Sequence, residues 1–216
     1  MLFRLLVATV LALAAPARAF ETPGLDQAVS TYRLDAVTEL EGKLSGRLSA
    51  YQRAEILASK ALILSSQKED ADAKRQALAA VEALKASIAA GEDLIASHFL
   101  LFKLYGQLTA SDWSFALKTR DPLRYLQTQA PKDRRTRIAE AMNWLFTPGL
   151  FGGNPPKAIE RLETLHAEAY DPEVANLLAL AYQQAGKRDK ARELAQRILE
   201  RNPQDRSAQA VLERLR

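Results

Sequence analysis

The sequence predicts an all-α protein built from stacked antiparallel helix pairs, with essentially no β-sheet. Ala, Leu, Glu, Arg, Lys and Gln are abundant and glycine is rare, at nine of 216 residues, which favours helices. Apolar residues recur with a period close to 3.6, and no alternating strand pattern with hairpin turns occurs. The motif Gly-x-x-x-Lys-Ala appears twice at a spacing of 33 residues, a period typical of helix-pair repeats.

The first residues have the features of a Sec-type secretory signal peptide. A charged start is followed by a short apolar run and by an Ala-x-Ala pattern that ends at Ala19. A permanent membrane anchor needs about 20 apolar residues, whereas this run covers only residues 5–15 and ends at Pro16. We therefore expect residues 1–19 to be removed after Ala19. The mature protein is then periplasmic or secreted, with no stable membrane anchor.

Charge and cysteine content exclude several classes of function. The formal net charge of +4 falls to +2 once Arg4 and Arg18 leave with the signal peptide, so a nucleic-acid partner is not expected. The absence of cysteine excludes disulfides, thiol nucleophiles, thiolate metal sites and a lipid anchor on an N-terminal cysteine. Two histidines are too few for most other metal centres. We expect no metal and no cofactor.

Four helical segments follow the signal peptide. Residues 26–44, 47–66 and 70–89 each carry one apolar stripe, which is the pattern of a helix with one buried face. Residues 93–108 are apolar nearly all round, so this helix is expected in the middle of the array. Three glycines are expected to end or turn these helices: Gly42, Gly46 and Gly91.

The C-terminal third carries the most specific pattern. Residues 172–205 contain a small-residue and large-residue order that resembles a tetratricopeptide repeat, in which small side chains let antiparallel helices nest. The resemblance implies a superhelical stack of helix pairs, an α-solenoid. Ala195 and Ile198 depart from the family pattern as a paired exchange of large and small residues. Structural roles in the repeat are expected for Gly153, Ala158, Leu178, Ala179, Tyr182, Gly186, Ala191 and Pro203.

Each repeat buries its apolar face on a neighbour, so the rest of the chain is expected to complete the stack. The sequence predicts one domain over residues 20–216. Its parts are degenerate helical repeats at 20–108, an irregular aromatic and basic insertion at 109–154, and the C-terminal repeat with its capping helix at 155–216.

The insertion is the candidate site for partner binding. Residues 99–151 hold nine of the fifteen aromatic residues, and residues 118–137 hold seven Lys or Arg against two Asp. Aromatic anchors and arginine forks are typical of interfaces, but a filled core and a solvated charged face are the competing interpretations. The candidate partner-binding residues are Trp113, Tyr125, Arg134, Arg135, Trp144 and Phe151.

The glycine-rich segment 147–156 has two interpretations, a phosphate-binding loop and a structural elbow. Asn154 is a good helix N-cap, but Pro155 and Pro156 would occupy the first helical positions and have no N–H to offer an anion. The pattern therefore favours the structural elbow.

The order of an aromatic helix, Pro-Gly-x-Phe-Gly-Gly-Asn and Lys-Ala over about residues 144–165 resembles the periplasmic T-component proteins of TRAP transporters. That resemblance implies cryptic tetratricopeptide-like repeats and a periplasmic solute-binding protein as partner. Many T-components are lipoproteins, and this chain lacks the cysteine that such an anchor needs.

No catalytic constellation is present. His98 and His166 occur without a Glu-x-x-His pattern, and no serine lies in a Gly-x-Ser-x-Gly elbow. The expected function is a non-catalytic interaction or scaffold module whose partners are other cell-envelope proteins. The alternatives are an accessory subunit of a TRAP-type transport system, which would form an oligomer or retain a solute, and a hydrolase whose acids meet from distant segments.

Overall fold

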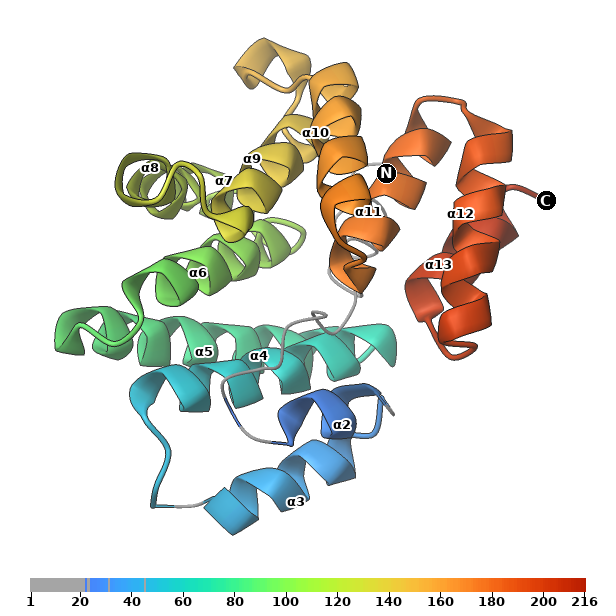
Figure 1. Ribbon diagram of the computed structural model, residues 1–216. Helices are drawn as coiled ribbons and strands as arrows, with labels where there is room; N and C mark the ends of the chain where they lie inside the picture. The colour runs from blue at the N-terminus through green and yellow to red at the C-terminus, as the bar shows by residue number, and fades with distance from the viewer. Residues whose placement is uncertain (1–21, 23, 31, 45) are drawn as a thin grey trace. The chain divides into compact units, whose positions relative to one another are not determined.

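The computed structural model describes the following residues: 22, 24–30, 32–44 and 46–216. The predicted signal peptide lies outside them. Over the described residues the fold is all-α, without strands, and neighbouring helices pack as antiparallel pairs, which confirms the predicted fold class (Figure 1). None of the described helices is both long enough and apolar enough to cross a membrane.

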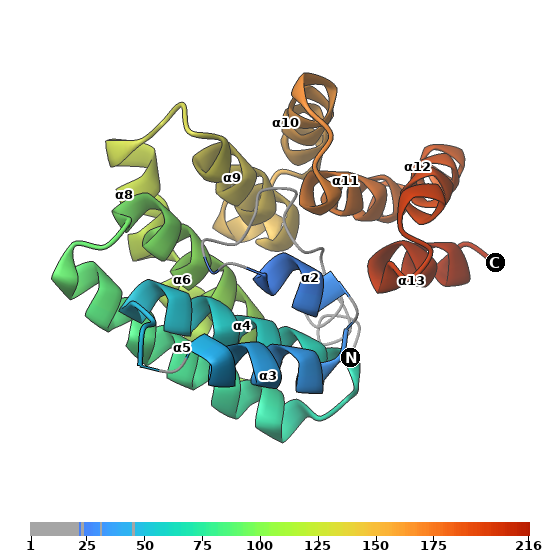
Figure 2. The same ribbon diagram turned by 60° about the horizontal axis from the view of Figure 1, so that its bottom comes forward.

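The described chain forms two compact units, and the first comprises residues 22–131. Its helices are α2 (Leu25–Ser30), α3 (Leu34–Leu44), α4 (Ala50–Ser66), α5 (Asp70–Ala90), α6 (Leu94–Leu108), α7 (Phe115–Lys118) and α8 (Arg120–Gln129). From α2 to α6, each helix packs on the next one along the chain, and Figure 2 shows α3 in front of α4 and α5.

Local capping explains where the helices of the first unit begin and end. Ser49 accepts a hydrogen bond from the Gln52 N–H while the Gln52 side chain accepts from the Ser49 N–H, a capping box that starts α4. Gly91 ends α5 in the left-handed conformation, at φ +75°, and Asp93 caps α6 by accepting from the Ala96 N–H at 2.9 Å. The turns predicted at Gly46 and Gly91 are confirmed, both at positive φ.

Helix α6 occupies the middle of the first unit, as its sequence predicted. It packs against α5 and against both α7 and α8. Its buried side chains include Leu101, Leu104 and Leu108, which join one core cluster with Leu84 of α5 and Phe115 of α7. A helix with apolar residues around most of its circumference is therefore covered on more than one side.

The second unit comprises residues 132–216. Its elements are α9 (Arg134–Phe146), a 3₁₀ turn η1 (Gly149–Phe151), α10 (Pro155–Glu168), α11 (Pro172–Gln184), α12 (Arg188–Arg201) and α13 (Arg206–Arg214). Each α-helix packs on the next, and the succession from α10 to α13 can be followed in Figure 2.

Helix α11 is the buried centre of the second unit. Ten consecutive residues, 173–182, are buried, because α10, α12 and α13 all pack against this helix. Asp171 caps its N-terminus, accepting from the Glu173 N–H at 2.9 Å. The Asn176 side chain donates to Asp205 at 3.0 Å, and Asp205 in turn caps α13, which ties the capping helix to the centre.

The residues predicted to build the repeat have the expected burial. Ala158 and Ala191 are fully buried on α10 and α12, where small side chains let the helices approach closely. Ala195 and Ile198, the paired exchange, are both buried as well. Pro203 follows the end of α12 at Arg201. The residues buried on α11 include Leu178, Ala179 and Tyr182.

One predicted helix is interrupted. The segment predicted as a single helix over 26–44 forms two helices, α2 and α3, and the chain turns at Tyr32, whose φ is +51°. Val29 and Tyr32 are buried before and at the turn, and Val37 is buried after it, so the apolar period continues across a break that it does not reveal. Gly42, expected as a helix stop, lies inside α3, because one glycine costs a helix only about 1 kcal/mol.

The segment 109–154 is mostly helical, which corrects the expectation of an irregular insertion. It contains α7, α8, α9 and η1, and the boundary between the two units at 131/132 divides it. The expected single domain over 20–216 is accordingly described as two units. Buried apolar residues at helical spacing hold α8 and α9: Leu123 and Leu126, then Ile138, Met142 and Leu145.

We expect Ala191→Leu to lower the free energy of unfolding by about 1 to 3 kcal/mol, because three added carbon atoms overpack a site with no exposed surface. Chemical denaturation followed by far-UV circular dichroism measures this change. Gln196→Leu on the exposed face of α12 is the matched control and should change stability by less than about 0.5 kcal/mol. Equal midpoints for the two variants would contradict close helix packing at Ala191.

Candidate functional site

The connection between α9 and α10, residues 147–154, is a loop with several internal backbone hydrogen bonds, called the elbow below. Within it, the Phe151 N–H and the Gly153 N–H both donate to the Pro148 carbonyl, at 2.8 and 3.2 Å. At its base the Asn154 N–H donates to the Trp144 carbonyl at 2.8 Å. The elbow is therefore held by its own backbone hydrogen bonds and by the last turn of α9.

Gly153 is required by close approach of the backbone and not by a left-handed conformation. A Cβ at this position would lie 1.7 Å from the Thr147 carbonyl oxygen. Gly186, its counterpart 33 residues later, has a φ of +72° and has no atom within 4 Å of such a Cβ. The two repeat glycines thus serve different turns, a tight one after α11 and the larger elbow after α9.

The start of α10 agrees with the structural interpretation of the elbow. Asn154 is the N-cap, and its side-chain oxygen accepts from the Lys157 N–H at 3.1 Å. Pro155 and Pro156 occupy the first helical positions and have no N–H to donate. The helix terminus thus lacks two of the donors that an anion-binding N-terminus uses.

The tip of the elbow exposes two large apolar side chains. Leu150 is 96% exposed and Phe151 is 67% exposed, and both belong to η1. Sequence reasoning identified Phe151 but missed Leu150. The sequence did contain a signal for Leu150, which is its position in a Pro-Gly-x-Phe-Gly-Gly turn. An apolar residue in such a turn does not belong to the apolar stripe of a helix, so the helical period does not predict its burial.

Trp144 lies below the tip, beneath two cations of α10. The Lys157 ammonium is 4.2 Å from the centre of a Trp144 ring, and the Arg161 guanidinium is 5.2 Å from it. Arg161 also forms an ion pair with Glu140 at 2.7 Å. Trp144 is half-buried, so its ring supports both the α9–α10 contact and a cationic surface next to the elbow.

Arg134 has an internal structural role. Its guanidinium donates to the Leu165 and Ala169 carbonyls, both at 3.1 Å, at the C-terminus of α10. It also lies 3.5 Å from Asp171 and 3.6 Å from Glu168. Only 15% of the side chain is exposed. The predicted role of Arg134 in partner binding stays a prediction.

The neighbouring arginines bind differently. Arg135 contacts Asp133 at the start of its own helix, at 3.2 Å, and is partly exposed. Arg137 binds both carboxylate oxygens of Glu168, at 2.8 and 2.6 Å, which adds a second link between α9 and α10. Three of the seven basic residues predicted as a possible contact surface are therefore engaged within the second unit.

The remaining two candidates belong to the first unit. Tyr125 of α8 stacks on His98 of α6, with ring centres 3.8 Å apart, so its ring contributes to helix packing. Trp113 precedes α7 and is 54% exposed. The six candidates thus divide between the two units, and the elbow with Trp144 is the group that the second unit brings together.

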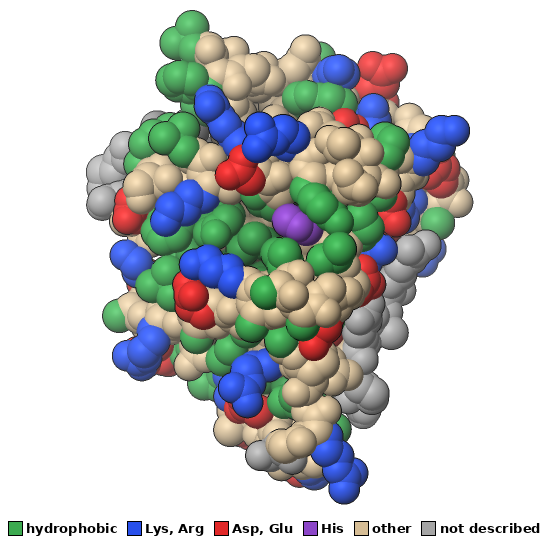
Figure 3. Space-filling model, turned by 90° about the vertical axis from the view of Figure 1, so that its left-hand side faces the viewer, with side chains coloured by type: hydrophobic (Ala, Val, Ile, Leu, Met, Phe, Trp, Pro, Cys, Tyr) green, Lys and Arg blue, Asp and Glu red, His purple; other side chains and the backbone are tan. Residues whose placement is uncertain are grey.

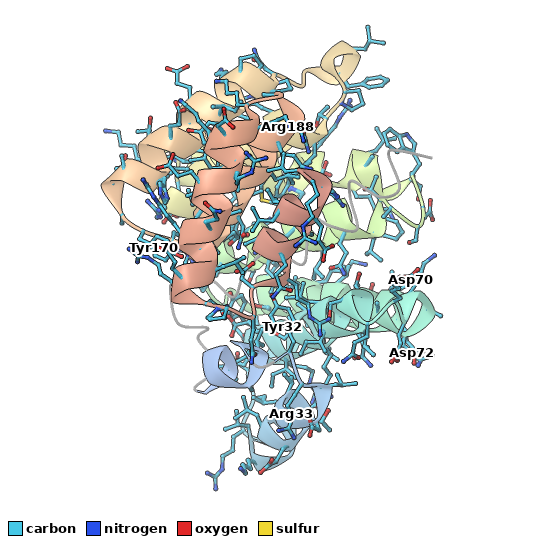
Figure 4. The ribbon with its side chains drawn as sticks, turned by 90° about the vertical axis from the view of Figure 1, so that its right-hand side faces the viewer. Tyr32, Arg33, Asp70, Asp72, Tyr170 and Arg188 are labelled. Atoms are coloured by element: carbon cyan, nitrogen blue, oxygen red, sulfur yellow. The ribbon has the colours of Figure 1, made fainter. Side chains whose placement is uncertain are left out.

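A cationic and aromatic cluster lies at the α10–α11 connection. Arg201 of α12 lies over Tyr170, 4.0 Å from the ring centre, and His166 contacts the same ring edge-on. Tyr170 and Arg188 are both labelled in Figure 4, and Arg188, the first residue of α12, donates to the Leu215 carbonyl at 2.7 Å. Burial, with the charges of Arg197, Arg201 and Arg134, lowers the pKa of His166.

Both histidines should make the protein less stable in mild acid. Burial lowers the pKa of His98 as well, so both folded-state values lie below the unfolded value of about 6.5. Protonation then favours the unfolded chain. The contribution to stability is present above about pH 6.5 and is lost as the pH falls through the folded-state pKa values.

Urea denaturation at a series of pH values between about 8 and about 5.5, above the range in which most carboxylates titrate, tests this pH dependence. The double variant His98→Gln, His166→Gln should have a flatter profile than the parent protein. Loss of the His98–Tyr125 stack lowers stability equally at every pH and leaves the slope interpretable. An unchanged slope in the double variant would contradict the assignment to these two histidines.

Among the described residues, no group of three or more His, Asp or Glu side chains is arranged to hold a metal ion.

Comparison with known proteins identifies one similarity. Residues 152–215 match the family model of the tetratricopeptide repeat, and this match covers the end of the elbow and helices α10 to α13. Such repeats form a generally non-catalytic fold that mediates protein–protein interactions. Searches of curated proteins and of solved structures found no significant match.

Proposed function

We propose that the protein is a non-catalytic interaction or scaffold module whose second unit contacts partner proteins through the tip of the elbow. The observation that carries this proposal is the exposure of Leu150 and Phe151 on a loop whose base is held by backbone hydrogen bonds. Apolar side chains on a pre-ordered loop add buried area to a complex without the entropic cost of ordering that loop. The tetratricopeptide match to residues 152–215 supports the same class of function.

The cations beside the elbow favour an acidic border on the partner. Lys157 has no carboxylate within ion-pair distance among the described residues, and its ammonium lies over Trp144, near the base of the elbow. A partner that receives Leu150 and Phe151 in an apolar pocket, with carboxylates at its rim, would combine apolar anchoring with charge-guided orientation.

We further propose that the protein works in the cell envelope after export. Support comes from the signal-peptide pattern of residues 1–19. Cell fractionation and N-terminal sequencing of the purified protein test it, and a mature chain that begins at Phe20 is expected. A cytoplasmic protein that keeps residues 1–19 would contradict export.

Site-specific crosslinking tests the elbow as a contact surface. A photo-reactive amino acid at position 150 should capture a discrete envelope protein in living cells, and Phe151→Asp should abolish the capture without changing the far-UV circular dichroism. The matched control carries the same amino acid at position 209, an exposed residue of α13, and should not capture that protein. Equal capture from both positions, or capture that is unaffected by Phe151→Asp, would contradict the proposal.

The elbow motif also supports a narrower proposal, that the partner is a periplasmic solute-binding protein of a TRAP-type transport system. Its basis is the resemblance of residues 144–165 to T-component proteins. Native mass spectrometry discriminates the two proposals. A symmetric oligomer or a retained small solute favours the transport accessory, and a solute-free protein that binds other envelope proteins favours the scaffold.

A further inference from the structure

A second exposed apolar surface lies in the first unit, along α7 and α8. Trp113 and Leu117 are four residues apart and are 54% and 63% exposed. Phe115, between them, is buried against the core of the unit. Residues 113–118 thus have a buried side, where Phe115 packs into the core, and an exposed side that carries Trp113 and Leu117.

The outward side continues as a basic stripe along α8. Thr119 joins the two helices with helical dihedral angles, φ −67° and ψ −22°, so the helical spacing continues through it. Arg120 and Arg124 therefore follow Leu117 on the same face, and both are exposed, while Leu123 and Leu126 face inward. The face drawn in Figure 3, the side of α7 and α8, mixes hydrophobic, basic and acidic side chains.

Positive charge predominates around Trp113 and Leu117. Lys74 of α5, Lys118 and Arg120 have no carboxylate within ion-pair distance among the described residues, whereas Arg124 pairs with Asp121 at 2.8 Å. Asp112 is next to Trp113 in the sequence. Hydrogen bonds from Ser114 lower its pKa, and the charges of Lys74 and Lys118 lower it further.

We propose that Trp113 and Leu117, bordered by Lys118 and Arg120, form a site that binds reversibly to the surface of a membrane that contains anionic phospholipids. Tryptophan and leucine enter the interfacial region of a bilayer, and lysine and arginine keep their stems along the apolar layer while their charges contact lipid phosphates. The charge of the border is complementary to such a surface.

The cations beside the two apolar side chains favour an anionic lipid surface as the occupant. Here two large apolar side chains project from one turn, next to Lys118 and Arg120. Peripheral membrane binding needs no more than a few inserted side chains together with several cations, because the two contributions add.

The experiment uses Trp113 as a local reporter. The chain has two tryptophans, so Trp144→Phe leaves Trp113 as the sole source of indole fluorescence. This full-length variant is titrated with vesicles of phosphatidylcholine that contain about one third phosphatidylglycerol, and with vesicles of phosphatidylcholine alone. We expect a blue shift, quenching by brominated acyl chains, and affinity about tenfold higher for the anionic vesicles, falling as the salt rises from about 0.05 M to about 0.5 M.

Variants separate this site from the elbow. Leu117→Asn and Lys118→Glu change exposed residues and should each weaken vesicle binding about fivefold or more, with unchanged circular dichroism. Leu150→Asn, the matched change at the elbow, should leave vesicle binding unaltered. No blue shift with anionic vesicles, equal affinity for neutral vesicles, or insensitivity to Leu117→Asn would overturn the proposal. Capture of a protein at position 117 without vesicle binding would also overturn it and would identify the stripe as a protein-docking surface.

Discussion

Replacing Gly153 with alanine is expected to destabilise the second unit by about 2 to 4 kcal/mol, an unusually large effect for one methyl group. The added Cβ would lie 1.7 Å from the Thr147 carbonyl oxygen and 2.7 Å from its carbonyl carbon. Both are backbone atoms, so no side-chain rotation relieves the clash. The elbow has to open, and the hydrogen bond from Asn154 to the Trp144 carbonyl is then weakened or broken.

Urea unfolding followed by Trp144 fluorescence, in a Trp113→Phe background, measures this change at the elbow itself. Gly149→Ala is the matched control, because Gly149 lies in the same elbow, has no positive φ, and has no atom within 4 Å of the place that an added methyl group would occupy. We expect its stability to stay within about 0.5 kcal/mol of the parent protein. Similar losses in the two variants would show that the close approach at Gly153 is not the cause.

Replacing Arg134 with alanine is expected to lower the free energy of unfolding by about 2 to 3 kcal/mol, because hydrogen bonds to a charged group are among the stronger ones. The substitution removes the donors to the Leu165 and Ala169 carbonyls at the end of α10, where carbonyl groups lack the helical partners that they have in the interior of a helix. It also leaves Asp171, which is buried, without its cation.

Thermal and urea unfolding of the purified variants measure the loss. Arg134→Lys keeps the charge without the planar fork, so it should recover only part of the stability. Arg197→Ala is the control, since this exposed arginine pairs with Glu193 on its own helix and should cost less than about 0.5 kcal/mol. If the Arg134 and Arg197 variants unfold alike, the capping role of Arg134 is wrong.

Helical periodicity and the repeat spacing predicted most of the second unit. Ala158 and Ala191 have the same place in the Gly-x-x-x-Lys-Ala motif, and both are fully buried where helices meet. A repeated motif reports a repeated packing environment, because each helix pair buries its small residues against the next pair. The all-apolar segment 93–108 likewise predicted a helix that is covered on several sides.

Periodicity was less informative where the chain turns without a break in its apolar pattern. The turn at Tyr32 was missed, because buried residues continue at helical spacing on both sides of it. Aromatic and basic residues between 109 and 154 obscured the apolar period of α8 and α9. Composition therefore suggested an insertion at a place where the chain forms ordinary amphipathic helices.

Local sequence also does not distinguish residues whose neighbours differ only in space. Arg134 and Arg135 are adjacent and chemically identical, yet one binds the end of α10 and the other binds Asp133 at the start of its own helix. The assignment depends on which side of α9 faces α10, and helix packing decides that. The exposure of Leu150 depends in the same way on how the elbow folds back on Trp144.

The sequence by itself determined the all-α fold, the 33-residue repeat and the position of its small and apolar residues, because periodic burial leaves a periodic record along the chain. Only the tertiary structure decided that Gly153 serves a backbone contact while Gly186 serves a left-handed turn, and that Arg134 caps a helix. Those roles arise from atoms brought together from distant positions, and their geometry has no period that a sequence can display.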